Sequence, residues 1–157
     1  LTFYFQYEKP NRKYLLLKKK FLMKKLLSTN YSDMAFNFAM LVLRVGLGIV
    51  MLPHGYQKLV HFGEYRTRFF NLFGIGSTIS LSLAILAEVL CSIFLIFGLF
   101  TRPAALVLAI HLFVIIFKVN TGTILGKSEF ELTLLLGFFT LLLVGGGKYS
   151  VEGGMGK

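Results

Sequence analysis

Three ionisable residues interrupt long apolar runs of the chain, and their types could support proton chemistry. Arg44, Glu88 and His111 each stand within a stretch of apolar residues. Placing an ionisable group inside a bilayer costs about 2.5 to 3.5 kcal/mol on insertion scales, so such a residue is expected to be paired or functional. A carboxylate or an imidazole can accept a proton near neutral pH. We therefore predict that these three residues form an intramembrane polar cluster.

The predicted depths of the three side chains are similar. At about 1.5 Å per helical residue, Arg44 and His111 lie about 12 Å from the inner surface and Glu88 about 18 Å from it. Two interpretations stay open. In one, Arg44 and Glu88 form a buried pair that sets the register of two helices, with His111 as a neighbour. In the other, the three line a pocket where Glu88 or His111 accepts protons from an oxidised substrate. The second favours His111, because Arg44 would keep Glu88 ionised.

A second candidate site lies toward the outer end of the first apolar run. In the segment HGYQK, Lys58 could supply charge and His54 a hydrogen bond to an anion or a quinone head group. Gly55 would let the ligand approach the backbone. The alternative is that these side chains only reach for the membrane surface, accompanied by a salt bridge between Lys118 and Glu131.

Metal and haem sites are not expected. Three His, one Cys and scattered carboxylates show no metal-ligand spacing. Among the histidines, His54 and His111 are the pair that could come from different helices at depth, but their predicted depths differ by about 15 Å, too much for two axial haem ligands. Cys91 has no second cysteine for an intrachain disulfide.

The elements that carry these residues are predicted to be membrane helices. The chain has 157 residues, of which 55% are hydrophobic and 15% charged, and a mean hydropathy of +0.72, which argues against a water-soluble fold. Four runs are about long enough to cross the hydrocarbon core of a bilayer as helices. They span residues 35–53, 75–100, 103–119 and 130–147. Strands are excluded by the lack of period-2 alternation. The predicted fold class is an all-α, integral membrane four-helix bundle, in which Gly46, Gly48 and Gly137 allow close helix approach.

The charge distribution predicts domains and orientation. Residues 1–34 hold eight basic against two acidic residues. This basic tail is expected in the cytoplasm by the positive-inside rule, and four crossings return the C-terminus there. The rule already accounts for the tail, so nucleic acid is not an expected partner. Residues 35–152 form the membrane domain and 153–157 a second cytoplasmic tail. Residues 1–22 are interpreted as an upstream extension, with Met23 as the start.

Several short motifs, in order, resemble the DoxX family of small four-helix bacterial membrane proteins. They are RVGLG at 44–48, HGYQK at 54–58, Glu88, GLFTRPAAL at 98–106 and GGGKYSVE at 145–152. The resemblance implies a multi-pass protein of the bacterial inner membrane. It also implies similarity to subunits linked with quinone-dependent thiosulfate oxidation in archaea and with membrane redox complexes in mycobacteria.

The sequence and the resemblance lead to two functional hypotheses. The first is a membrane subunit of a redox assembly that handles quinone or sulfur compounds with a redox partner protein. The second is a non-catalytic membrane scaffold or small-solute permease. Independent catalysis is not expected, because the sequence has no cofactor-binding motif, no nucleophile with a base and no thiol pair. The lipid bilayer is the first expected partner, and a homo-oligomer is a further option.

Overall fold

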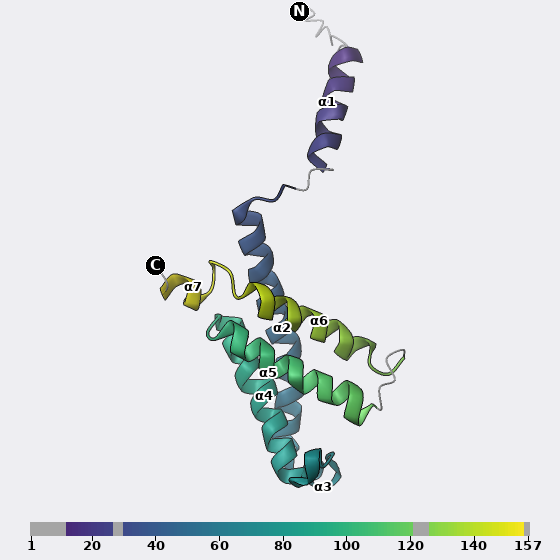
Figure 1. The fold of residues 1–157 in the computed structure, drawn as a ribbon, viewed down its shortest axis with the longest axis vertical. Helices are drawn as coiled ribbons and strands as arrows, with labels where there is room; N and C mark the ends of the chain where they lie inside the picture. The colour runs from purple at the N-terminus through teal and green to yellow at the C-terminus, as the bar shows by residue number, and fades with distance from the viewer. Residues whose placement is uncertain (1–11, 27–29, 121–125, 156–157) are drawn as a thin grey trace, which may run out of the picture. The chain divides into compact units, whose positions relative to one another are not determined.

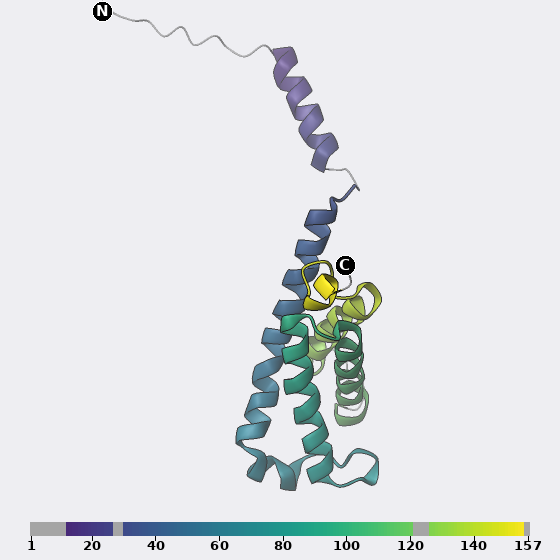
Figure 2. The same ribbon diagram turned by 90° about the vertical axis from the view of Figure 1, so that its left-hand side faces the viewer.

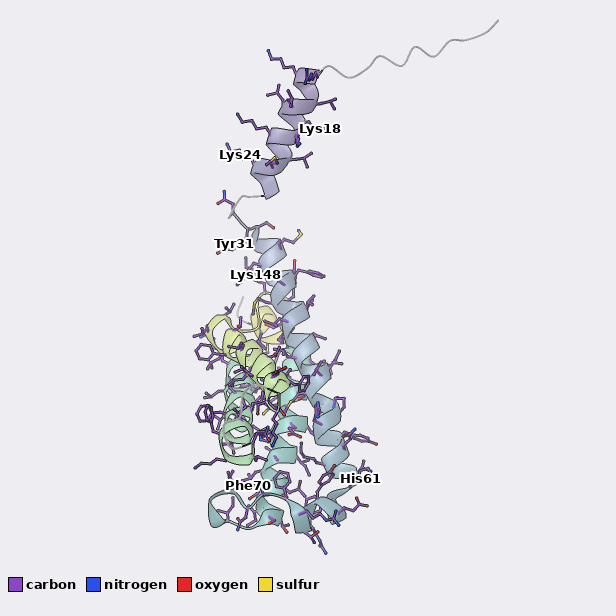
Figure 3. All side chains as sticks on the ribbon, turned by 90° about the vertical axis from the view of Figure 1, so that its right-hand side faces the viewer. Lys18, Lys24, Tyr31, His61, Phe70 and Lys148 are labelled. Atoms are coloured by element: carbon purple, nitrogen blue, oxygen red, sulfur yellow. The ribbon has the colours of Figure 1, made fainter. Side chains whose placement is uncertain are left out.

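The computed structural model describes residues 12–26, 30–120 and 126–155, and every regular element in these ranges is helical. The chain divides into two compact units, residues 1–32 and 33–157. The first unit contains one helix, α1 (Arg12–Leu26). Its basic side chains, Lys18 and Lys24 among them, project from the helix in Figure 3. The all-α prediction is confirmed for the described residues.

The second unit begins with α2 (Asp33–Val60), which is longer than predicted. This 28-residue helix continues past Pro53, which is the predicted end of the first span. A proline removes one backbone hydrogen bond, but membrane helices tolerate this loss. The extra turns carry Lys58 on the same helix as Arg44, which matters for the candidate site.

Helix α4 (Ser77–Phe97) packs along α2 in the opposite direction, as Figures 1 and 2 show. Close contact is possible because glycines of α2 face α4. A Cβ atom on Gly48 would lie 2.7 Å from a side-chain carbon of Ile96, and one on Gly55 would lie 2.8 Å from Cβ of Glu88. The predicted contact at Gly46 is wrong, because no atom lies within 4 Å of the position its Cβ would take. Two short helices, α3 (Phe62–Arg68) and η1 (Leu72–Gly74), connect α2 to α4.

A second helical pair lies across the first. Helix α5 (Thr101–Val114) runs into a π-helical turn, η2 (Ile115–Val119), and is followed by α6 (Glu129–Val144). In Figures 1 and 2 α5 and α6 lie side by side and oblique to α2 and α4. As predicted, α6 approaches α2 at Gly137, where an added Cβ would meet Leu47 at 2.9 Å. A short helix, α7 (Val151–Met155), ends the described chain.

Three of these helices are long and apolar enough to cross a membrane. They are α2, α4 and the continuous stretch of α5 and η2, residues 101–119. Helix α6 has 16 residues, fewer than the roughly 20 needed for an untilted crossing of about 30 Å. Many large apolar side chains on the three long helices are exposed, Val42, Leu86 and Ile110 among them, and lipid covers such surfaces.

Candidate functional site

The centre of the site is the carboxylate of Glu88, which is buried in the middle of the helical unit. Its side chain is 1% exposed. The ammonium of Lys58 donates to both carboxylate oxygens, at 2.7 Å and 2.6 Å, and Nε2 of His111 lies 2.7 Å from Oε1. The three side chains come from α2, α4 and α5, so the cluster joins three helices of the unit. Because an ammonium can only donate, Glu88 is the acceptor in this arrangement and is ionised.

This cluster is electrically balanced. A buried carboxylate alone would be very unfavourable in an apolar interior, and a single ammonium compensates its charge. In the neutral tautomer that donates from Nε2 to Glu88, Nδ1 of His111 is an acceptor. That Nδ1 makes no hydrogen bond within the described ranges. The cluster therefore holds one available proton acceptor next to a buried ion pair.

Two cavities flank this cluster. The first, here called the polar cavity, has a volume of about 130 Å³. Its lining includes four ionisable side chains: His54, Lys58, Glu88 and Glu131. The second, here called the apolar cavity, has a volume of about 260 Å³, and its polar lining is limited to Ser80 and His111. Phe70 also lines the apolar cavity, and Figure 3 places it at the end of the unit that carries His61.

The predicted pair of Arg44 and Glu88 is wrong. Arg44 is 1% exposed, but its guanidinium donates to the backbone carbonyls of Leu95, Ile96 and Tyr149 at 2.9, 3.3 and 3.1 Å. Two of these carbonyls belong to the last turn of α4, where a cation is favoured by the helix dipole. Arg44 thus caps the C-terminal end of α4 and, through its bond to Tyr149, holds the C-terminal segment against it. It does not belong to the polar cluster.

The predicted depths took the inner ends of α2 and α4 to lie at one level. The packing instead places Gly48 beside Ile96 and Gly55 beside Glu88. Glu88 is therefore level with Gly55, which is eleven positions, or about 16 Å, beyond Arg44. The side chain of Arg44 is too short to reach Glu88 over that distance.

The structure also revises the second predicted site. Gly55 is buried against Glu88 and Val89, so its missing Cβ serves helix packing and leaves no room for a ligand. Lys58 directs its charge to Glu88. His54 does line the polar cavity, where its ring lies 5.8 Å from that of Phe130.

The predicted salt bridge between Lys118 and Glu131 is not formed in the described part of the chain, where Glu88 pairs with Lys58 and His111, and Asp33 with Lys148. Sequence reasoning missed Lys58 as the partner of Glu88, because a span ending at Pro53 placed the lysine outside the membrane. Because membrane helices tolerate proline, the sequence allowed a first helix that continues through Pro53 and carries Lys58, and this was the signal that could have identified the lysine. Within the described ranges no group of three or more His, Cys, Asp or Glu side chains is arranged to hold a metal ion.

Three membrane-length apolar helices around a buried ion pair define the class of this protein: a helical, multi-pass membrane protein with an intramembrane polar site. The family profile of DoxX matches residues 39–121, more than half of the chain. The chain belongs to the DoxX family. This match confirms the resemblance and contains four of its five motifs, while GGGKYSVE lies beyond it. No curated protein and no solved structure matches the chain significantly.

Proposed function

We propose that this protein is the membrane subunit of a redox assembly and that it binds a quinol in the apolar cavity next to His111. One observation carries the proposal: the ring of His111 lines an apolar cavity on one side and contacts a buried carboxylate on the other. This arrangement suits a lipid-soluble molecule with a hydroxyl group. The cavity volume, about 260 Å³, approaches the range of roughly 300 to 1,000 Å³ typical of small-molecule pockets.

The residues of the site suit proton transfer. Oxidation of the quinol to the quinone releases two hydroxyl protons and two electrons; the electrons pass to an acceptor in a partner protein, and the two protons leave one after the other through His111. Nδ1 of His111 accepts the hydroxyl hydrogen bond and then the proton. Nε2 can pass its own proton to Oε1 of Glu88, which lies 2.7 Å away. The ammonium of Lys58 holds Glu88 in place by bonds to both oxygens.

A sulfur-containing anion fits this protein less well than a quinol. Lys58 is the cation of the polar cavity, and Glu88 already compensates its charge. Glu131 lines the same cavity and adds a negative charge. An anion would meet net repulsion there, whereas the apolar cavity presents no charge to a neutral ligand.

Equilibrium binding of a short-chain benzoquinol to the full chain in lipid nanodiscs tests this proposal. The variant His111→Gln loses the acceptor nitrogen, and we expect it to bind about tenfold more weakly, the effect of one hydrogen bond of about 1.4 kcal/mol. Ala87→Phe, which fills the apolar cavity, should abolish binding. The matched control is His61→Gln, because His61 is exposed and lines neither cavity. Failure of the unmodified chain to bind the benzoquinol would leave the scaffold or permease hypothesis.

We also propose a fourth crossing, by α6, and a bacterial inner-membrane location with both termini in the cytoplasm. Two contacts support the crossing: Phe130 lies against His54, and the backbone of Lys148 donates to Asn37 at 2.7 Å. His54 and Asn37 are seventeen residues apart on α2, or about 26 Å, so the α6 segment covers most of the hydrocarbon thickness. Reporter fusions after residues 73, 102 and 157 should report outside, inside and inside. An outside signal at the C-terminus would contradict the arrangement.

The electron acceptor in this proposal requires a redox partner protein, and the exposed apolar helix faces leave a homo-oligomer as an option. Purification in mild detergent followed by mass spectrometry of intact complexes tests both. A subunit that carries a redox centre should co-purify with the chain.

A further inference from the structure

We propose that the polar cavity is a water-filled proton outlet and that Glu131 is its terminal carboxylate. This proposal rests on the proton-accepting role of His111 given above. Protons that reach Glu88 would cross the cavity on water to Glu131, at the start of α6, and leave from there. Glu131 was not among the candidate site residues identified from the sequence.

The cluster of Lys58, Glu88 and His111 lies between the two cavities. His111 lines the apolar cavity and Glu88 lines the polar one. Ile115 is common to both linings, so this side chain and the His111–Glu88 contact lie between the two cavities. Ile115 is also the first residue of η2, and π-helical turns occur often at functional sites. A proton can therefore pass from one cavity to the other through His111 and Glu88 while an apolar ligand cannot.

The size and lining of the polar cavity suit water better than a larger ligand. Its volume of about 130 Å³ is enough for several water molecules, each of which occupies about 30 Å³ of liquid. It is well below the size of a pocket for a ring-containing ligand. Its ionisable lining provides the polar partners that a buried water needs. The side chain of Lys58 is 21% exposed, so the cavity wall is not sealed from the surface.

Glu131 adds a negative charge to the polar cavity, and its carboxylate is available to water. Lys58, Glu88 and Glu131 together give the cavity one net negative charge with His54 neutral. A negative cavity attracts protons and repels anions. The carboxylate of Glu131 makes no ion pair or hydrogen bond with the described parts of the chain, so its oxygens are available to water. Its side chain is half-buried, between the cavity and the surface.

The proton steps balance without a further reactant. His111 gains a proton at Nδ1 and releases the one on Nε2 to Oε1 of Glu88, which becomes a neutral carboxylic acid. Water in the cavity then carries a proton from Glu88 to the Glu131 carboxylate, and Glu88 is again ionised beside Lys58. His111, left with its proton on Nδ1, returns to the Nε2–H tautomer by exchanging that proton with water before it accepts the second quinol proton. Glu131 finally releases the proton to bulk water.

Thiol labelling tests the water-filled cavity without any redox activity. Leu134 lines the polar cavity and Ala87 the apolar one, and the two are 5% and 6% exposed, so Leu134→Cys and Ala87→Cys form a matched pair in a Cys91→Ala background. We expect a water-soluble cationic methanethiosulfonate to label Leu134→Cys at least tenfold faster than Ala87→Cys, and faster than the anionic reagent does. Equal slow labelling of both variants, or faster labelling by the anionic reagent, would overturn the outlet.

Proton release tests the role of Glu131. Bound benzoquinol is oxidised in nanodiscs by ferricyanide, two ferricyanide ions per quinol, and the two protons are followed with a pH dye. Glu131→Gln should slow proton appearance about tenfold with unchanged benzoquinol affinity, and Glu131→Asp should restore much of the rate. Glu129→Gln is the matched control, since Glu129 is exposed and accepts from the backbone of Gly126. Unchanged release in Glu131→Gln would refute the relay. Absent benzoquinol binding would refute the proposed function, and thiol labelling would still decide the cavity.

Discussion

The pairing of Lys58 with Glu88 predicts a coupled and asymmetric loss of stability when either residue is neutralised. In Lys58→Met, the carboxylate of Glu88 stays 1% exposed and loses the ammonium that bonds both of its oxygens. Removing one partner of a buried pair costs about 3 to 5 kcal/mol. The bond from His111 remains, and Lys58 is itself partly exposed. We therefore expect a loss of about 3 kcal/mol, at the lower end of this range.

The reverse change should cost less. In Glu88→Gln the orphan charge is the ammonium of Lys58, which is 21% exposed and sits on a flexible stem that can turn toward the surface. We expect a loss of about 1 to 2 kcal/mol. The double variant leaves no orphan charge, so its loss should be about 2 kcal/mol smaller than the sum of the two single losses.

Unfolding of the full chain by sodium dodecyl sulfate in mixed micelles measures these losses for the three variants under one condition. The control cycle combines Arg44→Met with Glu88→Gln. Since Arg44 bonds backbone carbonyls near the end of α4, this second cycle should be additive within about 0.5 kcal/mol. Additive effects for Lys58 and Glu88, or strong coupling for Arg44 and Glu88, would refute the assignment of partners.

Four substitutions test the packing of the helical unit. Gly55→Ala should lower the free energy of unfolding by about 1 to 3 kcal/mol, because its Cβ would lie 2.7 Å from Val89 Cγ2. Gly46→Ala should be neutral or stabilising by up to about 1 kcal/mol, because its Cβ would meet no atom within 4 Å. The same micellar unfolding assay compares the two variants. Arg44→Met should speed backbone hydrogen exchange of Glu152, whose N–H donates to Gly98 in the segment that Arg44 holds, and unchanged exchange would contradict this role. Gly98→Ala should destabilise by more than about 1 kcal/mol, because φ is +74° and the new Cβ would meet the guanidinium of Arg44; a thermal scan that matches the unmodified chain would refute this.

The location of the helices was largely predictable because it depends on local properties of the chain. Runs of apolar residues must form helices in lipid, and the three long helices lie where hydropathy placed them. The boundaries were less predictable. Pro53 reads as a helix end by its missing N–H, yet α2 continues to Val60 because packing against α4 stabilises the turns that follow.

The composition of the site was only partly predictable. A Glu and a His inside apolar segments are unfavourable alone, so their mutual contact could be expected from the sequence. The sequence could not decide whether Arg44 or Lys58 is the cation beside Glu88. Both are long basic side chains on the same helix, fourteen residues apart, and either choice satisfies the same charge rule.

The relative register of α2 and α4 decided that choice, and register is a property of the packed structure. The two helices are joined through α3 and η1, which do not constrain how far one helix slides along the other. The constraint comes from the contacts of Gly48 and Gly55 with α4, since each glycine admits a particular part of the opposite helix. Hydropathy therefore determined which long segments are membrane helices and that Arg44, Glu88 and His111 lie within them. Interdigitation of side chains between helices determined which buried charges meet, because that depends on contacts between residues far apart in the chain.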